Sequence, residues 1–360
     1  MKEVPRFSFL TSAYRTERFL RRTIDSVVAQ TCPDWELVVV DNGNSDAIAA
    51  IVEEYAADAR IKLIRQENRG YVGGVMAAAG GASGRYLCVL DSDDLLMPNY
   101  CTEVNTLLDS DPTVDAVGVD ASRMTDDGPE HVGGYLRSIG VKTRIDPNEN
   151  LVLADVLGGL VPYYTAAVRR EAWDAVGGFD PGIPDVDESV VFWLRIVCKY
   201  NVRVLPLRLA CYRLRSDSLS RDPANVDAFE AELERAFNTV EPSTPVEADA
   251  LDATLRRIRY WKRLRQARSA LLTGDDRAAR NLAADAFAQR QTLRSVAILL
   301  AVTVAPGVLR WIHPLKQRAE EQFECFVSWV RLRSAAAKRS ESSYRPGCVR
   351  QHPGCISART

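Results

Sequence analysis

The chain has 360 residues, of which 46% are hydrophobic and 26% charged, the composition of a globular protein that can bury a large core. Its formal net charge of −2 gives no overall attraction to nucleic acid, so we expect no nucleic-acid partner. Its three histidines, His131, His313 and His352, lie far apart, which argues against a zinc centre or a histidine-based catalytic dyad. Carboxylates are therefore the expected chemical groups.

Eight cysteines are spread along the chain without a CxxC pair, mostly inside apolar strings such as YLCVL. This pattern is typical of reduced thiols in a core and favours a cytoplasmic protein. The first ten residues, MKEVPRFSFL, lack the basic-then-apolar order of a signal peptide and lead directly into a strand pattern. We therefore expect a cytoplasmic location, with peripheral contact at the inner face of the membrane.

From Arg6 to Asp120, short β-rich apolar strings alternate with helical stretches. The strings are FSFLTSA, WELVVVD, IKLIR, RYLCVLD and VDAVGVD, and the clearest helices are ERFLRRTIDSVVAQ and AIAAIVEEYAAD. This βαβαβ order predicts an α/β fold with a mostly parallel sheet flanked by helices. Ligands of such sheets bind beyond the carboxyl ends of the strands, so these ends predict the site.

Polar residues follow three of these strand ends. Ser12 lies at the end of the first string and Tyr14 follows it, where Tyr14 can stack on a nucleotide base or pack internally. Asp41 ends the second string, where its carboxylate can accept a hydrogen bond from a base N–H, although a plain turn explains the same segment. Asp91, Asp93 and Asp94 end the fourth string and supply the hard oxygens that Mg²⁺ or Mn²⁺ prefers. An acidic turn that caps the next helix is the alternative.

Residues 121–150 are rich in Gly, Asp and Pro and predict a surface loop. Helix and strand signals resume and continue to Ser220. Beyond Asp222 the chain becomes helical, most clearly at 227–239, 249–272 and 275–290. We predict a catalytic domain over 1–222, a helical appendage over 223–333 and a basic, disordered tail over 334–360.

Two segments of the appendage suggest contact with a membrane surface. Residues 256–268, RRIRYWKRLRQAR, hold seven basic residues and no acid, and apolar side chains recur at helical spacing through 255–271. Residues 296–312, VAILLAVTVAPGVLRWI, are too short and too interrupted to span a bilayer but are apolar enough to lie on one. For the segment 255–271, the alternative is that its apolar stripe docks on the catalytic domain or on neighbouring helices.

The motifs occur in the order and spacing of inverting family 2 glycosyltransferases with the GT-A fold, which the chain resembles from residue 6 to about 221. The resemblance rests on five segments: FLTSAYRTERFLRRTIDSVVAQT, WELVVVDNGNSD, ENRGYVGGVMAAAGGASGRYLCVLDSDD, VRREAWDAVGGFDPGIPDVDESVVFWLRI and YRLRSDSLS. It implies a hexosyltransferase-like, metal-dependent enzyme that uses a nucleotide-sugar donor. The first candidate for this donor is a UDP-sugar. The implied acceptor is a glycan or lipid-linked molecule of cell-envelope polysaccharide synthesis.

The resemblance also implies roles for individual residues. Ser12 and Tyr14 would frame the base, and Asp41 would contact the uracil. Asp91 would contact the ribose or the metal, and Asp93 would hold Mn²⁺ or Mg²⁺. The chain departs from the family pattern at Asn42, where a second Asp is usual, and at Val75 and Met76, where Arg-Asn is common. Arg215 replaces a frequent His and would contact the diphosphate directly.

The position of the general base is the fourth departure. The family usually has a Glu-Asp pair that begins five residues before the Trp of a sequence like FWLR, and the Asp of this pair acts as the base. Counting back from Trp193, this chain has Glu188 at the Glu position and Ser189 at the Asp position. Glu188, and after it Asp187, are the candidate bases. Two alternative functions follow: a non-catalytic nucleotide-sugar-binding or scaffold protein with a degenerate site, and a metal-dependent nucleotidyltransferase.

Overall fold

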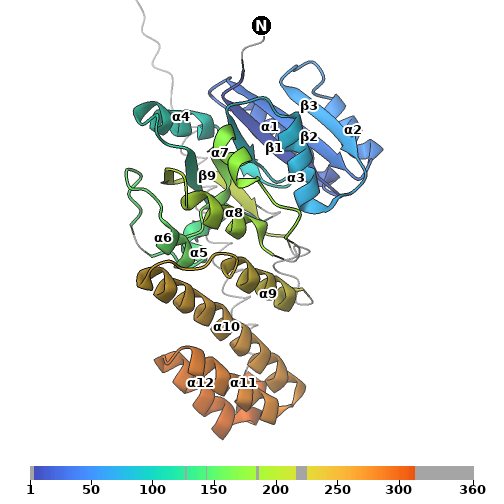
Figure 1. Cartoon of the computed structure of the whole chain (residues 1–360). Helices are drawn as coiled ribbons and strands as arrows, with labels where there is room; N and C mark the ends of the chain where they lie inside the picture. Colours follow the sequence, from blue (N-terminus) through green and yellow to red (C-terminus); the bar gives the residue numbers. More distant parts are fainter. Residues whose placement is uncertain (1–3, 126–127, 143, 184–185, 216–224, 313–360) are drawn as a thin grey trace, which may run out of the picture. The chain divides into compact units, whose positions relative to one another are not determined.

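The computed structural model describes residues 4–125, 128–142, 144–183, 186–215 and 225–312 (Figure 1). Contacts divide the chain into two compact units, residues 1–262 and 263–360, which meet within one long helix, α10. The predicted domain boundary at residue 222 lies 40 residues before this division and remains a prediction. The predicted tail, 334–360, lies outside the described residues.

The first unit is built around a mixed sheet, which has nine strands among the described residues and the order β3-β2-β1-β4-β8-β6-β9-β5, with β7 paired to β6. The strands are β1 (Phe7–Ala13), β2 (Trp35–Asn42), β3 (Ile61–Gln66), β4 (Tyr86–Val89), β5 (Leu95–Leu96), β6 (Ala116–Thr125), β7 (Gly128–Gly134), β8 (Tyr163–Arg169) and β9 (Val202–Arg213). Strands β3, β2, β1 and β4 run parallel, and β6 pairs parallel with β9. The predicted α/β sheet is confirmed, with antiparallel pairing at β5, β7 and β8.

Helices cover both faces of this sheet because successive strand side chains point to opposite faces. Phe7 and Phe9 of β1 join one core cluster, whereas Leu10 joins the other. The first cluster takes side chains from α1 (Glu17–Val28), α2 (Asp46–Glu53) and α4 (Tyr100–Ser110). The second takes side chains from α3 (Gly70–Gly81), α6 (Leu153–Leu157), α7 (Arg170–Val176), α8 (Glu188–Val197) and α9 (Val226–Phe237).

The prediction of a surface loop over 121–150 is wrong for its first part. Strand β6 continues to Thr125, β7 returns beside it, and α5 (Tyr135–Ser138) follows. Ala121 and Leu136 are buried. The Gly- and Asp-rich composition hid these elements because β7 pairs at the end of β6, where turn-forming residues are tolerated.

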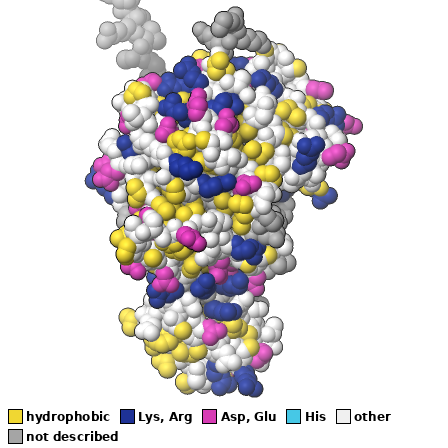
Figure 2. Space-filling model, viewed as in Figure 1, with side chains coloured by type: hydrophobic (Ala, Val, Ile, Leu, Met, Phe, Trp, Pro, Cys, Tyr) yellow, Lys and Arg dark blue, Asp and Glu magenta, His cyan; other side chains and the backbone are white. Residues whose placement is uncertain are grey.

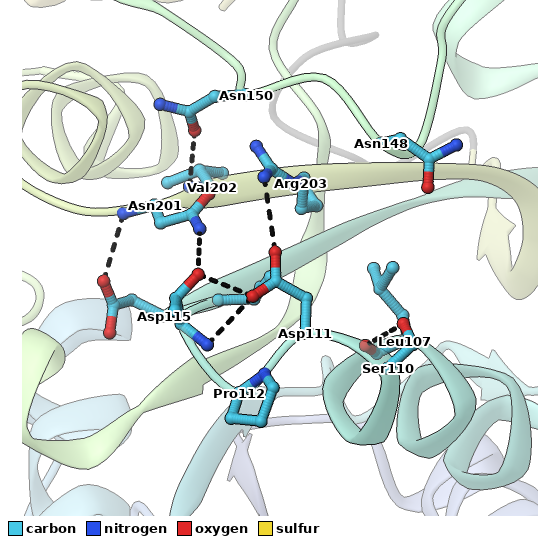
Figure 3. A network of polar contacts seen from close by, with 12 residues as sticks. Leu107, Ser110, Asp111, Pro112, Asp115, Asn148, Asn150, Asn201, Val202 and Arg203 are labelled. Atoms are coloured by element: carbon cyan, nitrogen blue, oxygen red, sulfur yellow. Dashed lines mark hydrogen bonds and ion pairs between the residues drawn. The ribbon is translucent and has the colours of Figure 1, made fainter.

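A polar network ties together the edge of the sheet where β6 and β9 begin (Figure 3). The backbone N–H of Asn201 donates to Asp115 over 3.0 Å, and the Asn201 amide donates to Thr113 over 2.9 Å. The backbone N–H of Val202 donates to Asn150 over 2.8 Å. Because β6 runs parallel to β9 and antiparallel to β8, this edge is opposite the carboxyl ends of β1, β2 and β4. The network therefore fixes the fold away from the candidate site.

The remaining helices are α10 (Pro245–Thr273), α11 (Asp276–Gln289) and α12 (Leu293–Val304), and they confirm the predicted C-terminal helices. In α10, Leu255 and Ile258 belong to the core of the first unit. Leu271 packs with Ala279 of α11 and Val302 of α12 in a small core of the second unit. No single helix of the described chain is long and apolar enough to cross a membrane, although α12 and residues 306–312 pass that test together across a 108° bend.

Candidate functional site

The candidate site lies where β1, β2 and β4 end, because parallel strands bring their carboxyl ends to one edge. The register pairs Ala13 of β1 with Asp41 of β2, and Leu10 with Val89 of β4. The predicted site residues therefore lie at one edge of the sheet, either in the last residues of neighbouring strands (Ser12 and Asp41) or just after them (Tyr14, Asp91 and Asp93). Arg215 joins them two residues after β9 ends.

Asp41 is held by two protein donors. The backbone N–H of Ser45 donates to its Oδ1 over 2.9 Å, and Arg65 donates from Nε to its Oδ2 over 3.1 Å. The carboxylate is fully buried, so the ion pair with Arg65 offsets the cost of placing its charge inside the protein. Asp41 thus fixes the turn after β2, and contact between this carboxylate and a uracil remains a prediction.

Ser12 and Tyr14 depend on glycines opposite them. A Cβ added at Gly74 of α3 would come 1.9 Å from the Ser12 oxygen, so only glycine allows α3 to approach β1 this closely. A Cβ at Gly43 would come 3.0 Å from the Tyr14 ring. Tyr14 is 42% exposed, with the Arg15 guanidinium 5.0 Å from its ring centre. An exposed aromatic ring beside a glycine turn is available for stacking on a base.

The three aspartates after β4 have different partners. Asp91 accepts a hydrogen bond from the Tyr71 hydroxyl over 2.8 Å, and Asp93 accepts one from Arg215 over 3.0 Å. Asp94 is buried and accepts from the backbone N–H of Arg213 over 2.7 Å and from the hydroxyls of two tyrosines, Tyr163 and Tyr164. Asp94 therefore anchors the loop, and Asp91 and Asp93 remain the candidates for ligand contact.

The electrostatics of this cluster favour a bound cation. Burial, followed by the negative charge of Asp93, raises the pKa of Asp91 to about 7. Burial and the charges of Asp93 and Asp91 likewise raise the pKa of Asp94 well above its usual range. Excess negative charge at one place is relieved either by protonation or by a positive ligand.

Two arginines stand beside this acidic loop. Arg213 donates from Nε to the Asp93 backbone carbonyl over 2.7 Å, and Arg215 pairs with the Asp93 carboxylate. The guanidinium carbons lie 4.6 and 5.1 Å from the centre of the Phe19 ring, so α1 supports both side chains. A guanidinium held in this way can bind a phosphate group with charge-assisted hydrogen bonds.

The candidate bases lie at the start of α8 and differ in their surroundings. Glu188 is buried, accepts the backbone N–H of Asp180 over 3.3 Å, and has its pKa raised by burial. Asp187 caps the helix by accepting the backbone N–H of Val190, and it also accepts the Ser189 hydroxyl over 2.5 Å. Ser189, at the position where the family pattern has Asp, is thus a partner of Asp187.

The charge of Asp187 reaches the aspartate loop. Desolvation and then the charges of Asp91, Asp94 and Asp187 raise the pKa of Tyr71, the donor to Asp91. Burial and then the charge of Asp187 raise the pKa of Tyr135, whose ring packs 5.2 Å from that of Tyr163. The strongest influences on Glu188 are instead burial, the Asp180 backbone and Arg195. Asp187 therefore acts electrostatically on Tyr71, the tyrosine that donates to Asp91.

Sequence reasoning missed several residues of the site. Tyr71 and Arg213 lie inside two of the segments that carry the resemblance but were given no role, and Tyr164 lies outside them. Their roles come from contacts with residues 20 to 120 positions away. Arg65 could have been found, since it pairs with Asp41 in the parallel register of β2 and β3. Among the described residues, no group of three or more His, Cys, Asp or Glu side chains could hold a metal by itself.

Comparison with known proteins relates part of the chain to a known family. Residues 8–171, which contain β1 to β8 and the aspartate loop, match the model described as Glycosyl transferase family 2. This segment is therefore similar in sequence to family 2 glycosyltransferases. Asp187, Glu188 and Arg215 lie beyond the matched residues.

Curated proteins that are similar to this chain extend the comparison beyond residues 8–171. The succinoglycan biosynthesis protein ExoO of Rhizobium meliloti is 25% identical over 331 residues, which cover 88% of this chain and 91% of ExoO. EpsH of Bacillus subtilis is 37% identical over 103 residues, 28% of this chain and 30% of EpsH. A Haemophilus influenzae glycosyltransferase is 29% identical over 33% of this chain. The chain spans about a third of the length of these last two relatives, 30% and 37%.

Solved structures show the fold of the chain. The mannosyltransferase PcManGT from Pyrobaculum calidifontis, solved with GDP-Man and Mn²⁺, has a TM-score of 0.53 and 18% identity, covering 86% of this chain and 84% of that one. TarS residues 1–349 from S. aureus has a TM-score of 0.51 and 16% identity, covering 86% and 92%. The predicted GT-A type sheet flanked by helices, with C-terminal helices, is confirmed.

Proposed function

We propose that this chain is an inverting glycosyltransferase of the cytoplasm, which moves a sugar from a nucleotide-diphosphate donor to a glycan or lipid-linked acceptor in cell-envelope polysaccharide synthesis. A UDP-sugar is the first candidate for the donor. The family match and the similarity to ExoO, a protein named for succinoglycan biosynthesis, support this reading. PcManGT, which shares the fold, was solved with a nucleotide-sugar and Mn²⁺.

One observation carries the proposal. A single edge of the sheet presents an exposed aromatic ring at Tyr14, two carboxylates at Asp91 and Asp93, and a guanidinium at Arg215. These groups match the parts of a nucleoside diphosphate: a base that stacks, and a diphosphate that needs positive charge. We assign the base to the Tyr14 end and the diphosphate to the Arg215 end.

Asp91 and Asp93 fit a divalent cation. Their mutual repulsion and the burial of Asp91 favour a positive partner. Mg²⁺ is commonly held by one or two carboxylates together with substrate phosphates, so the absence of a third acidic ligand in the described chain is no obstacle. Mn²⁺ or Mg²⁺ bound there would neutralise charge on the departing diphosphate. Arg215 already brings one positive charge to the same place.

The transfer itself needs a base on the acceptor side. The acceptor oxygen forms a bond to the anomeric carbon while the bond from that carbon to the diphosphate oxygen breaks, and the electron pair of the broken bond stays with the diphosphate. The acceptor's hydroxyl proton passes to a carboxylate. We assign this proton to Asp187, with Glu188 as the second candidate, because the charge of Asp187 acts on Tyr71, which donates to Asp91.

A thermal-shift screen tests the proposed donor site. The purified chain is heated with UDP, GDP, CDP and their common sugar conjugates, first with Mn²⁺ or Mg²⁺ and then with EDTA. We expect one nucleotide class, UDP first, to raise the melting temperature in the presence of metal, and EDTA to remove the effect. No shift with any nucleotide would contradict the proposal. A shift without turnover on any acceptor would favour the non-catalytic nucleotide-sugar-binding protein.

A further inference from the structure

The second unit has one helix face that its own core does not use. Helix α12 packs on α11, whose buried residues are alanines. The buried residues of α12 are Ser295 and Val302, and Val302 packs against Ala279 of α11. Ser295 and Val302 lie seven residues apart, two helical turns, and so mark one side of α12. The side of α12 that faces α11 is therefore narrow and is covered by α11.

The opposite side of α12 is apolar and exposed. Leu293, Val296, Leu300 and Val304 recur at intervals of three and four residues, which places them along one line of the helix. Leu293 is 92% and Val304 79% exposed. In Figure 2, yellow side chains gather over the part of this unit that Figure 1 labels α12. A line of four exposed aliphatic side chains is not the scattered exposure that ordinary surfaces show.

The apolar surface continues past the end of the helix. After the 108° bend, Val308, Trp311 and Ile312 are exposed, Trp311 by 71%. We name these exposed apolar side chains together the α12 face: Leu293, Val296, Leu300, Val304, Val308, Trp311 and Ile312. A tryptophan at the end of an aliphatic stripe is typical of a segment that lies in the interface of a bilayer, because the indole ring suits the boundary between headgroups and acyl chains.

Charge indicates which partner covers the α12 face. Residues 263–360 contain 17 Arg and Lys against 7 Asp and Glu, a net charge of +10. The whole chain carries 46 against 48, so residues 1–262 hold 29 against 41, a net charge of −12. A positive unit is attracted to anionic headgroups and repelled by a second copy of itself. The segment 313–360 has 9 basic residues against 4 acidic ones, so its net charge is also positive. Charge therefore favours an anionic lipid surface over this segment as the partner of the α12 face.

We propose that the α12 face docks on an anionic lipid surface, with α12 lying in the plane of the membrane. The proposal departs from the sequence expectation at one point: Leu255, Ile258 and Leu271 of the segment 255–271 are buried in the protein, so lipid contact belongs to 293–312. Docking does not depend on the proposed enzymatic reaction, because it uses neither the aspartate loop nor a donor.

Vesicle co-sedimentation of the full chain tests the docking. The vesicles contain phosphatidylcholine alone or with phosphatidylglycerol. We expect the wild type to sediment with the anionic vesicles and to stay in solution with the neutral ones. Leu300→Glu and Trp311→Glu, made separately, should each lower the partition coefficient about tenfold or more, with unchanged melting temperatures because both side chains are exposed. Val246→Glu is the matched control, an exposed aliphatic residue of α10 outside the face.

Three results would overturn the proposal. The wild type could stay in solution with anionic vesicles, or both variants could sediment like the wild type. Alternatively, light scattering could detect a dimer that Leu300→Glu dissociates, which would make the α12 face an interface between copies. If one variant fails to fold, the other still decides, because Leu300 and Trp311 lie on opposite sides of the bend.

Discussion

At the scale of single residues, the start of α8 explains how the chain departs from the expected base position. Ser189 stands where an Asp is usual, but its hydroxyl donates to Asp187 over 2.5 Å. Asp187 also caps the helix, which holds the carboxylate in one orientation. Glu188 is buried against the Asp180 backbone instead. One turn of chain therefore offers two carboxylates with distinct surroundings.

Asn and Gln substitutions separate the two carboxylates. Asp187→Asn retains the helix cap and should lower kcat for donor hydrolysis, with water as the acceptor, by about 10²- to 10⁴-fold, the usual contribution of a general base. Glu188→Gln should lower it by less than about tenfold. The measurement is metal-dependent release of UDP from the donor that the thermal-shift screen selects, together with UDP affinity, which neither variant should change. A larger loss in Glu188→Gln would assign the base to Glu188.

At the scale of elements, a buried carboxylate joins β1, β2 and the turn before β4. Glu36 of β2 accepts the Ser8 hydroxyl over 2.6 Å, the Ser83 hydroxyl over 2.9 Å and the Gly84 N–H over 3.1 Å, and it pairs with Lys62 of β3 over 2.7 Å. Burial alone would raise its pKa, but these donors outweigh burial, and the pKa of Glu36 is lowered.

This lowered pKa makes stability depend on pH. A carboxylate whose pKa is lower in the folded state contributes stability above its unfolded pKa, about 4.3, and loses it as the pH falls through the folded value. Glu36→Gln should therefore lower the free energy of unfolding by about 2 kcal/mol at pH 7 and by less at low pH. Urea unfolding at several pH values measures this, with the exposed Glu53→Gln as control. A deficit that grows as the pH falls would contradict the assignment.

The elements also show what sequence patterns can and cannot supply. The strings FSFLTSA and WELVVVD predicted β1 and β2 because buried parallel strands are continuous apolar runs. The same patterns placed Asp91 and Asp93 at a strand end. They could not supply Tyr71 or Tyr164, which reach the aspartate loop from elsewhere in the chain. They also missed the strand content of 121–134, where the pairing of β6 with β7 and with β9 overrides a turn-like composition.

At the scale of the whole molecule, charge is divided unequally along the chain. Residues 1–262 carry a net charge of −12, and residues 263–360 carry +10. The acidic part contains the proposed donor site, where Arg213 and Arg215 supply local positive charge for a diphosphate. The basic part contains the α12 face. A net charge near zero therefore conceals two regions suited to different partners, which the formal charge of −2 could not reveal.

The central claim, that the strand ends form a metal-dependent nucleotide-sugar site, is tested most directly by calorimetric titration of UDP with Mn²⁺. Asp93→Ala is compared with Asp109→Ala, the same change on α4, where Asp109 pairs with Arg6 at the opposite edge of the sheet. We predict that the wild type and Asp109→Ala bind UDP alike and only with Mn²⁺, and that Asp93→Ala loses this binding. Equal affinity of Asp93→Ala and the wild type would contradict the account.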